Sequence, residues 1–137
     1  MSLQAFASLV NAFGPIKISR FGDTMHSQVE VFPDGKGFVL YQRADDPKRG
    51  LIGRGIRRVE LINISHLQFQ TFAYNYIRAD YPDNHILSIF LKTATMIEDY
   101  LPEKGVVSES VNKMNIYVPS VDLAEQITAY LEQAAGL

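Results

Sequence analysis

The sequence predicts an α+β fold: an antiparallel sheet of about five to seven strands, packed by N-terminal and C-terminal helices, with one or two internal helices. Three observations predict this class. Helical periodicity is strongest at the two ends, β-rich runs bounded by turn residues occupy the middle, and no internal repeat is visible. A chain of 137 residues buries roughly 68% of its unfolded surface, so we expect residues 1–137 to form a single globular domain.

The terminal helices are the clearest elements. Apolar residues recur at helical spacing over residues 2–13, and Gly14-Pro15 ends the pattern. A second apolar stripe runs over residues 121–135, where Ser120 is the expected N-cap and Gly136 the expected C-terminal stop. Both helices are amphipathic and should therefore pack on the sheet.

The clearest strands form a hairpin. Residues 28–42 are QVEVFPDGKGFVLYQ, and Pro33-Asp34-Gly35 supplies the turn, because proline presets φ and glycine accepts a positive φ. A polar loop over residues 44–50 comes next. It is followed by a strand over residues 55–64, whose two apolar phases suit a strand with both faces partly covered.

Residues 65–80, SHLQFQTFAYNYIRAD, allow two interpretations. Their aromatic content favours a strand, which would need a bulge near Thr71. Their apolar residues also match the helical template, and Ser65 with Gln68 forms a capping-box pattern. We favour the helix. Its buried stripe would include Phe69, Phe72 and Tyr76.

The C-terminal half predicts more short elements. After a turn over residues 81–84, HILSIFLKT at 85–93 is typical of a buried strand. TATMIEDYL at 93–101 predicts a short helix that ends before Pro102. Residues 106–119 predict a second hairpin, formed by VVSES and KMNIYVP.

Catalytic and metal-binding chemistry is sparse. The absence of cysteine excludes a disulfide framework and any thiolate metal site. Asp80, Asp83 and His85 could act as a general base or hold a metal, but a turn hydrogen-bonded to its own backbone is the preferred interpretation. We predict no catalytic residue, no metal and no cofactor. Enzymatic activity stays uncertain, and we favour a non-enzymatic function.

The location expected from the sequence is the cytoplasm. The N-terminal residues lack the basic region of a signal peptide, and the most apolar run, ILSIFL, is too short to span a bilayer. We therefore expect no membrane insertion.

Charge is unevenly distributed along a chain whose formal net charge is −2. Residues 36–58 contain seven basic and two acidic side chains, a balance of +5. Residues 98–137 contain seven acidic and two basic side chains, a balance of −5. Such segments can attract each other within the fold or between copies, or they can meet different partners.

The basic loop at residues 48–58, KRGLIGRGIRR, comes nearest to a chemical motif. Its glycines and arginines could cradle an anion, but it lacks the lysine and hydroxyl of the Walker A loop and the third glycine of the dinucleotide loop. If the segment is a strand, Arg57 and Arg58 point to opposite faces. The candidate anion-binding and partner-binding residues are Lys48, Arg49, Arg54 and Arg58. A solvated bend is the favoured interpretation and an anion site is the alternative.

The aromatic cluster around residues 69–81 is a second candidate surface. Tyr74, Tyr76 and Tyr81 could stack on bases or line a ligand pocket. A buried helical stripe is the simpler interpretation, with Tyr74 as an exposed contact.

The sequence ranks three functions without resembling any family. The first is a binding, adaptor or assembly domain that uses its charge-complementary segments, with a protein partner or self-association favoured and a nucleic acid or other polyanion possible. The second is a secretion-chaperone-like or phage or virion structural component, suggested by size and acidity. The third is a small-molecule-binding protein or enzyme with an aromatic-lined pocket.

Overall fold

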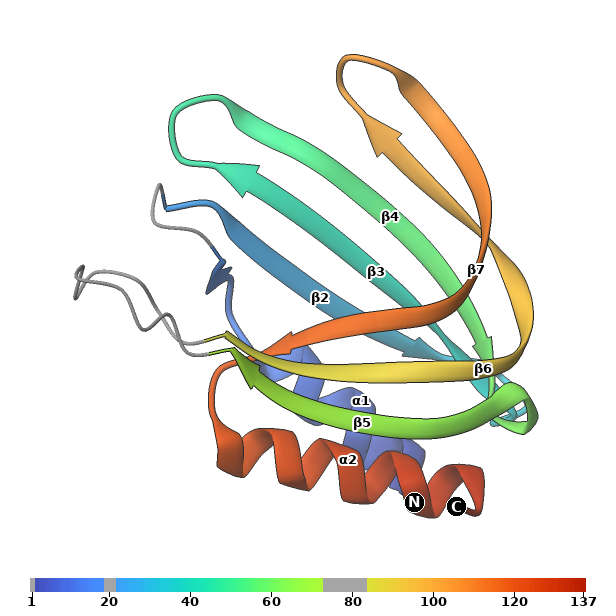
Figure 1. Cartoon of the computed structure of the whole chain (residues 1–137). Helices are drawn as coiled ribbons and strands as arrows, with labels where there is room; N and C mark the ends of the chain where they lie inside the picture. The colour runs from blue at the N-terminus through green and yellow to red at the C-terminus, as the bar shows by residue number, and fades with distance from the viewer. Residues whose placement is uncertain (1, 19–21, 73–83) are drawn as a thin grey trace.

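The computed structural model of the protein describes residues 2–18, 22–72 and 84–137, and it confirms the α+β class with one helix at each end (Figure 1). Within this part of the chain, two helices flank a seven-stranded antiparallel sheet. The helices are α1 (Ser2–Ala12) and α2 (Val121–Ala135). The strands are β1 (Ile16–Lys17), β2 (Thr24–Val31), β3 (Gly37–Asp46), β4 (Gly50–Glu60), β5 (Ile64–Phe72), β6 (Asn84–Leu101) and β7 (Gly105–Val118).

The long strand β6 organises the sheet, whose order is β1-β2-β3-β4-β6-β5 with β7 on the other side of β6. The first half of β6 pairs with β5, the second half pairs with β4, and β7 follows both halves. Figure 1 shows β6 and β7 bending together between these two regions. The sheet is therefore strongly curved.

An asparagine supports the point where β6 changes partner. The short 3-10 helix η1 (Leu61–Asn63) joins β4 to β5 and ends at this residue. The side-chain amide of Asn63 donates to the carbonyl oxygen of Thr93 at 2.9 Å, and its oxygen accepts from the backbone N–H of Thr93 at 2.9 Å. The pairing with β5 ends at Leu91 and the pairing with β4 begins at Ile97. At the bend, the side chain of Asn63 therefore makes the two backbone hydrogen bonds to β6 that a neighbouring strand would otherwise make.

The hydrophobic core lies between the helices and one face of the sheet, which we call the inner face. Phe6 of α1 meets Phe38 of β3 with ring centroids 5.2 Å apart, and both side chains are fully buried. The inner face includes Val29, Phe38, Leu40, Val59 and Ile97. We call the opposite side of β2, β3, β4, the second half of β6 and the first half of β7 the outer face.

The terminal elements match the sequence predictions closely. In α2, the Ser120 side chain accepts from the backbone N–H of Leu123 at 3.3 Å, and Gly136 has the left-handed φ of 72°. The hairpin of β2 and β3 turns through Gly35, whose φ is 71°. None of the described helices is long and apolar enough to cross a membrane.

The helix predicted over residues 65–80 is wrong where the structure describes it, because residues 64–72 form β5. Leu67 pairs with Ile89 and Phe69 with Leu87, so both side chains pack toward the core while Gln68 between them is exposed. Cross-strand burial therefore overrides the helical spacing. The register shift lies beside Ile64, not near Thr71.

The short helix over residues 93–101 and the second hairpin over residues 106–119 are also wrong. Residues 93–101 continue β6, in which Ile97 is buried while Met96 is 59% exposed. Residues 106–118 belong to one strand, β7, whose hairpin partner is β6. What suggested a turn in the sequence is a register shift opposite the bend of β6.

The predicted loop and strand boundaries around β4 need smaller corrections. β3 extends to Asp46 and β4 begins at Gly50, so the polar loop shrinks to three residues. The strand predicted over 55–64 stops at Glu60 because η1 follows. Several residues named above lie outside the described part of the chain: Tyr74, Tyr76, Asp80, Tyr81 and Asp83.

Candidate functional site

The glycines of KRGLIGRGIRR serve the strand β4 and its turn. Gly50 has a φ of 79°, which a left-handed turn position requires. Gly53 and Gly55 lie on the inner face, where a Cβ on Gly53 would come within 3.1 Å of the Leu101 side chain. A Cβ on Gly55 would overlap Arg57 and Asp99. These glycines permit close packing of β4 against β6.

Arg57 fixes β4 to β6 on the inner face. Its guanidinium donates to the Asp99 carboxylate at 2.6 Å, and the two side chains are 17% and 28% exposed. The pair joins the basic segment to the acidic segment, so part of their expected attraction occurs within the fold. As expected for a strand, the side chain of Arg58 lies on the other face.

Lys48 and Arg49, two of the four candidate residues, lie in the β3–β4 turn, where Asp46 organises the backbone. The Asp46 carboxylate accepts from the backbone N–H of Lys48 at 2.7 Å and of Arg49 at 2.9 Å. Its other oxygen lies 3.4 Å from the Arg49 guanidinium. The hydrogen bonds from Arg49 and Lys48 lower the pKa of Asp46. Arg49 is thus partly engaged within its own turn.

Arg54 and Arg58, the other two candidates, lie exposed on the outer face of β4 with Ile56 between them. The Arg54 guanidinium lies 4.8 Å from the ring centroid of Tyr100, and that of Arg58 lies 4.6 Å from the ring centroid of Phe32. The two arginines are four positions apart on the strand, which separates their Cα atoms by about 13 Å. The structure brings them onto one face but leaves Lys48 and Arg49 at the turn.

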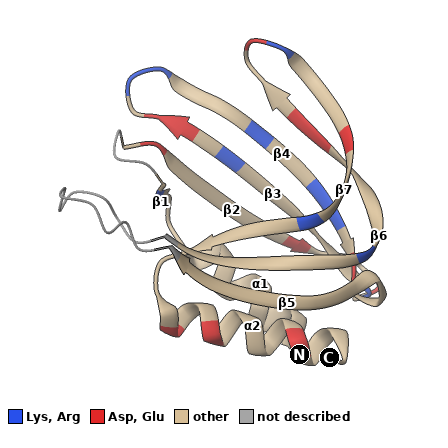
Figure 2. Cartoon of the chain, in the orientation of Figure 1, with Lys and Arg blue, Asp and Glu red and all other residues tan. Residues whose placement is uncertain are grey.

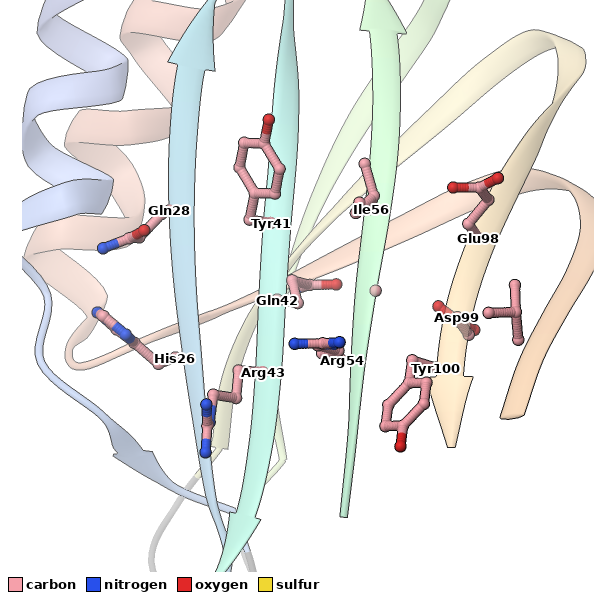
Figure 3. Close-up of a pocket in the computed structure, with 12 residues that line it drawn as sticks. His26, Gln28, Tyr41, Gln42, Arg43, Arg54, Ile56, Glu98, Asp99 and Tyr100 are labelled. Carbon is pink, nitrogen blue, oxygen red and sulfur yellow. The ribbon is translucent and has the colours of Figure 1, made fainter. Parts of the chain in front are cut away.

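Cross-strand rows on the outer face form a groove. We define the outer-face groove by the side chains of His26, Gln28, Tyr41, Arg43, Arg54, Ile56, Glu98, Tyr100 and Val106, which line a cavity of about 450 Å³ (Figure 3). One row aligns Gln28, Tyr41, Ile56 and Glu98, and the next aligns His26, Arg43, Arg54, Tyr100 and Val106.

The outer face exposes large apolar side chains. Tyr41 is 38% exposed, Ile56 42%, Met96 59% and Val106 69%. Single exposed apolar residues are ordinary, but a contiguous group of them marks a binding surface. These four lie on adjacent strands and on the same face.

The charges of the groove are mixed and only partly paired internally. The Arg43 guanidinium lies 3.0 Å from Asp45, and this hydrogen bond raises the pKa of Arg43. Tyr41 donates to Glu30 at 3.4 Å. Figure 2 shows basic residues along β3 and β4, whereas α2 carries acidic residues without basic ones. On β4 the exposed Arg54 and Arg58 lie on either side of the exposed Ile56.

The histidines do not gather into a site. His26 lines the outer-face groove. His66 is exposed and stacks on Phe90 with ring centroids 4.3 Å apart, and Nδ1 of His85 lies 3.0 Å from the Thr71 hydroxyl. Within the described residues, no group of three or more His, Cys, Asp or Glu side chains could hold a metal ion.

The sequence prediction missed most of the groove. Tyr41 and Ile56 could have been found from the alternation of β3 and β4, since each faces away from a buried neighbour. The residues from β6 could not, because the segment containing Met96, Glu98 and Tyr100 was predicted to be a helix.

No protein-family model matches the chain, and no curated protein sequence or solved structure is significantly similar to it.

Proposed function

We propose that this protein is a non-enzymatic protein-binding domain and that its outer face, which includes the outer-face groove together with Arg58 and Met96 outside the groove, is the recognition surface. One observation carries the proposal: Tyr41, Ile56, Met96 and Val106 are exposed on adjacent strands of a single face. Keeping such side chains in water costs free energy that burial against a partner recovers. An apolar centre with a polar rim is the usual anatomy of a protein interface.

The arginines define the partner's chemistry. Arg54, Ile56 and Arg58 alternate along β4, so charged, apolar and charged groups follow each other on the outer face. An extended segment also presents every second side chain to one side. We infer that the partner contributes an extended segment with two acidic residues four positions apart and an apolar residue midway. Acidic groups would then meet the arginines while the apolar residue covers Ile56.

The groove supports a protein partner better than a nucleic acid. Its positive charge is interrupted by Glu98, and Arg43 is engaged with Asp45. A polyanion would bring a charged group next to this acidic side chain, whereas a peptide can place its apolar residue there, because Glu98 pairs with Ile56. The secretion-chaperone-like and phage or virion alternatives stay predictions within the same binding class.

A synthetic peptide tests the proposal. The peptide carries two glutamates four positions apart with a leucine midway, and fluorescence anisotropy measures its affinity. We expect Arg54→Glu/Arg58→Glu to weaken binding by at least about tenfold, equivalent to ~1.4 kcal/mol. The control Lys48→Glu/Arg49→Glu changes the net charge equally, and it should weaken binding by less than about twofold because these residues lie in the β3–β4 turn and not on the outer face.

Two results would contradict the proposal. One is equal weakening by the Arg54→Glu/Arg58→Glu variant and by the turn variant, which would indicate non-specific electrostatic attraction. The other is tighter binding of labelled DNA than of the peptide, with affinity falling roughly two decades between 50 and 200 mM salt, as four phosphate contacts predict. That result would favour the polyanion alternative.

A further inference from the structure

The first half of β7 has an uncovered edge. Among the described residues β7 pairs only with β6, so the backbone groups that face away from β6 along residues 105–111 meet no other strand. Figure 1 shows this half at the margin of the β6–β7 hairpin. The side chains are also open, with Val106 69% and Val107 38% exposed. An open edge of this kind is a template for another strand.

The opposite margin of the sheet is protected. β1 covers the start of β2, and farther along the side chain of Asn11 takes the place of a strand. Its amide donates to the carbonyl oxygen of Val29 at 2.9 Å, and its oxygen accepts from the Val29 N–H at 2.6 Å. Proteins usually block free edges with proline, lysine or such caps. Residues 105–111 contain no proline or lysine, and Glu109 is their one charge.

We propose that residues 105–111 of β7 pair edge to edge with the same residues of a second copy of this chain. Antiparallel pairing of two identical strands is two-fold symmetric, as a closed dimer requires. A register centred on Ser108 places Ser108 opposite Ser108 of the second copy. It also places Val107 opposite Glu109, and Val106 opposite Ser110. No like charges then face each other directly, so the edge is complementary to itself.

The pairing has a structural consequence for the outer face. Val106 and Ser108 continue the cross-strand rows of Tyr100 and Glu98. Pairing across β7 would therefore extend one sheet through both copies and set their outer faces side by side. The proposal does not rest on peptide binding by the groove, since it derives from the backbone edge alone.

Charge variants of Ser108 test the pairing. Sedimentation equilibrium of the wild-type chain should give a dimer whose population rises with protein concentration. In Ser108→Lys the two introduced lysines would face each other, and in Ser108→Asp the two aspartates would, so each variant should dimerise at least about tenfold more weakly. Mixing the two variants should restore a dimer of one copy each. Ser8→Lys on the exposed side of α1 is the control and should leave the dimer unchanged.

Two results of these experiments would contradict the pairing of β7 with a second copy. A wild-type chain that stays monomeric at all concentrations overturns the proposal, and so does a dimer that both Ser108 variants retain. Hydrogen exchange on the wild-type chain gives a test that needs no variant: amides of residues 106–110 should exchange more slowly as concentration rises. Exchange independent of concentration in a confirmed dimer would place its interface elsewhere.

Discussion

Two neighbouring arginines on β4 show how differently the two faces of one strand are used. Arg57 on the inner face is 17% exposed and bonds to Asp99 at 2.6 Å, which ties β4 to β6. Arg58 on the outer face is exposed and lies over the ring of Phe32. The residue type is the same, so the face decides whether an arginine pairs with a carboxylate inside the fold or stays exposed beside an aromatic ring.

The next pair along β4 reverses the usual placement of side chains. Gly55 is buried on the inner face, whereas Ile56 is 42% exposed on the outer face. A strand shaped by stability alone would place the larger apolar side chain inside. The reversal follows from the close packing of β4 against β6 on the inner face, and it agrees with the recognition role proposed for the outer face.

Mutations on β3 should show the largest difference in stability between the two faces. Leu40 is fully buried in the core, so Leu40→Ala should lower the free energy of unfolding by about 2–5 kcal/mol. Tyr41→Ala, one residue away on the outer face, should change it by less than about 1 kcal/mol. Urea unfolding measures both. Equal losses for the two variants would show that the outer face is part of the stabilising core.

The glycine–isoleucine pair gives the next largest difference. A Cβ on Gly55 would push apart Arg57 and Asp99, so Gly55→Ala should destabilise by about 1–3 kcal/mol. Ile56→Ala should leave the free energy of unfolding nearly unchanged but weaken binding of the glutamate–leucine peptide. Urea unfolding measures the stability of both variants, and fluorescence anisotropy measures their affinity for the peptide. A stable Gly55→Ala would mean that the ion pair relaxes freely.

The carboxylates of β6 should show a smaller effect of the same kind. Asp99→Asn removes the charge that faces Arg57 on the inner face and should cost about 1 kcal/mol of unfolding free energy. Glu98→Gln, its outer-face neighbour, should stay within about 0.5 kcal/mol of the wild type. It should also bind the acidic peptide slightly more tightly. Thermal unfolding measures the stability of both variants, and peptide titration measures the affinity. A larger loss of stability in Glu98→Gln than in Asp99→Asn would contradict the prediction.

The smallest effect belongs to the β3–β4 turn, outside both faces. The hydrogen bonds from Arg49 and Lys48 lower the pKa of Asp46 from its ordinary value of 3.8. The stability from this carboxylate is therefore fully present above the unfolded-state pKa and is lost as pH falls through the folded-state pKa. An NMR titration should place the Asp46 midpoint below 3.8, and Asp46→Asn should remove that part of the acid dependence. A midpoint at or above 3.8 would contradict the turn geometry.

The sequence predicted the parts of the fold that local chemistry controls. The helix α2 has caps at both ends, α1 has a regular apolar spacing that ends before Gly14-Pro15, and the β2–β3 hairpin has a turn-forming glycine, so these elements could be located from nearby residues. The prediction that residues 1–137 form one domain stays a prediction.

The elements that were predicted wrongly depend on contacts between residues distant in sequence. Residues 93–101 have a helical pattern, but pairing with β4 on one side and β7 on the other makes them a strand. The prediction of the candidate site was incomplete for the same reason. Arg54 and Arg58 were found from their charge, whereas the Glu98 and Tyr100 beside them required knowledge of that pairing.

The most direct measurement of the central claim is an NMR titration of isotope-labelled protein with the glutamate–leucine peptide. Recognition by the outer-face groove predicts that the largest shift changes fall on Tyr41, Arg54, Ile56 and Tyr100. Inner-face residues such as Leu40 and turn residues such as Lys48 should change little. Shift changes centred on the turn or on α2, with the outer face unaffected, would contradict the proposed recognition surface.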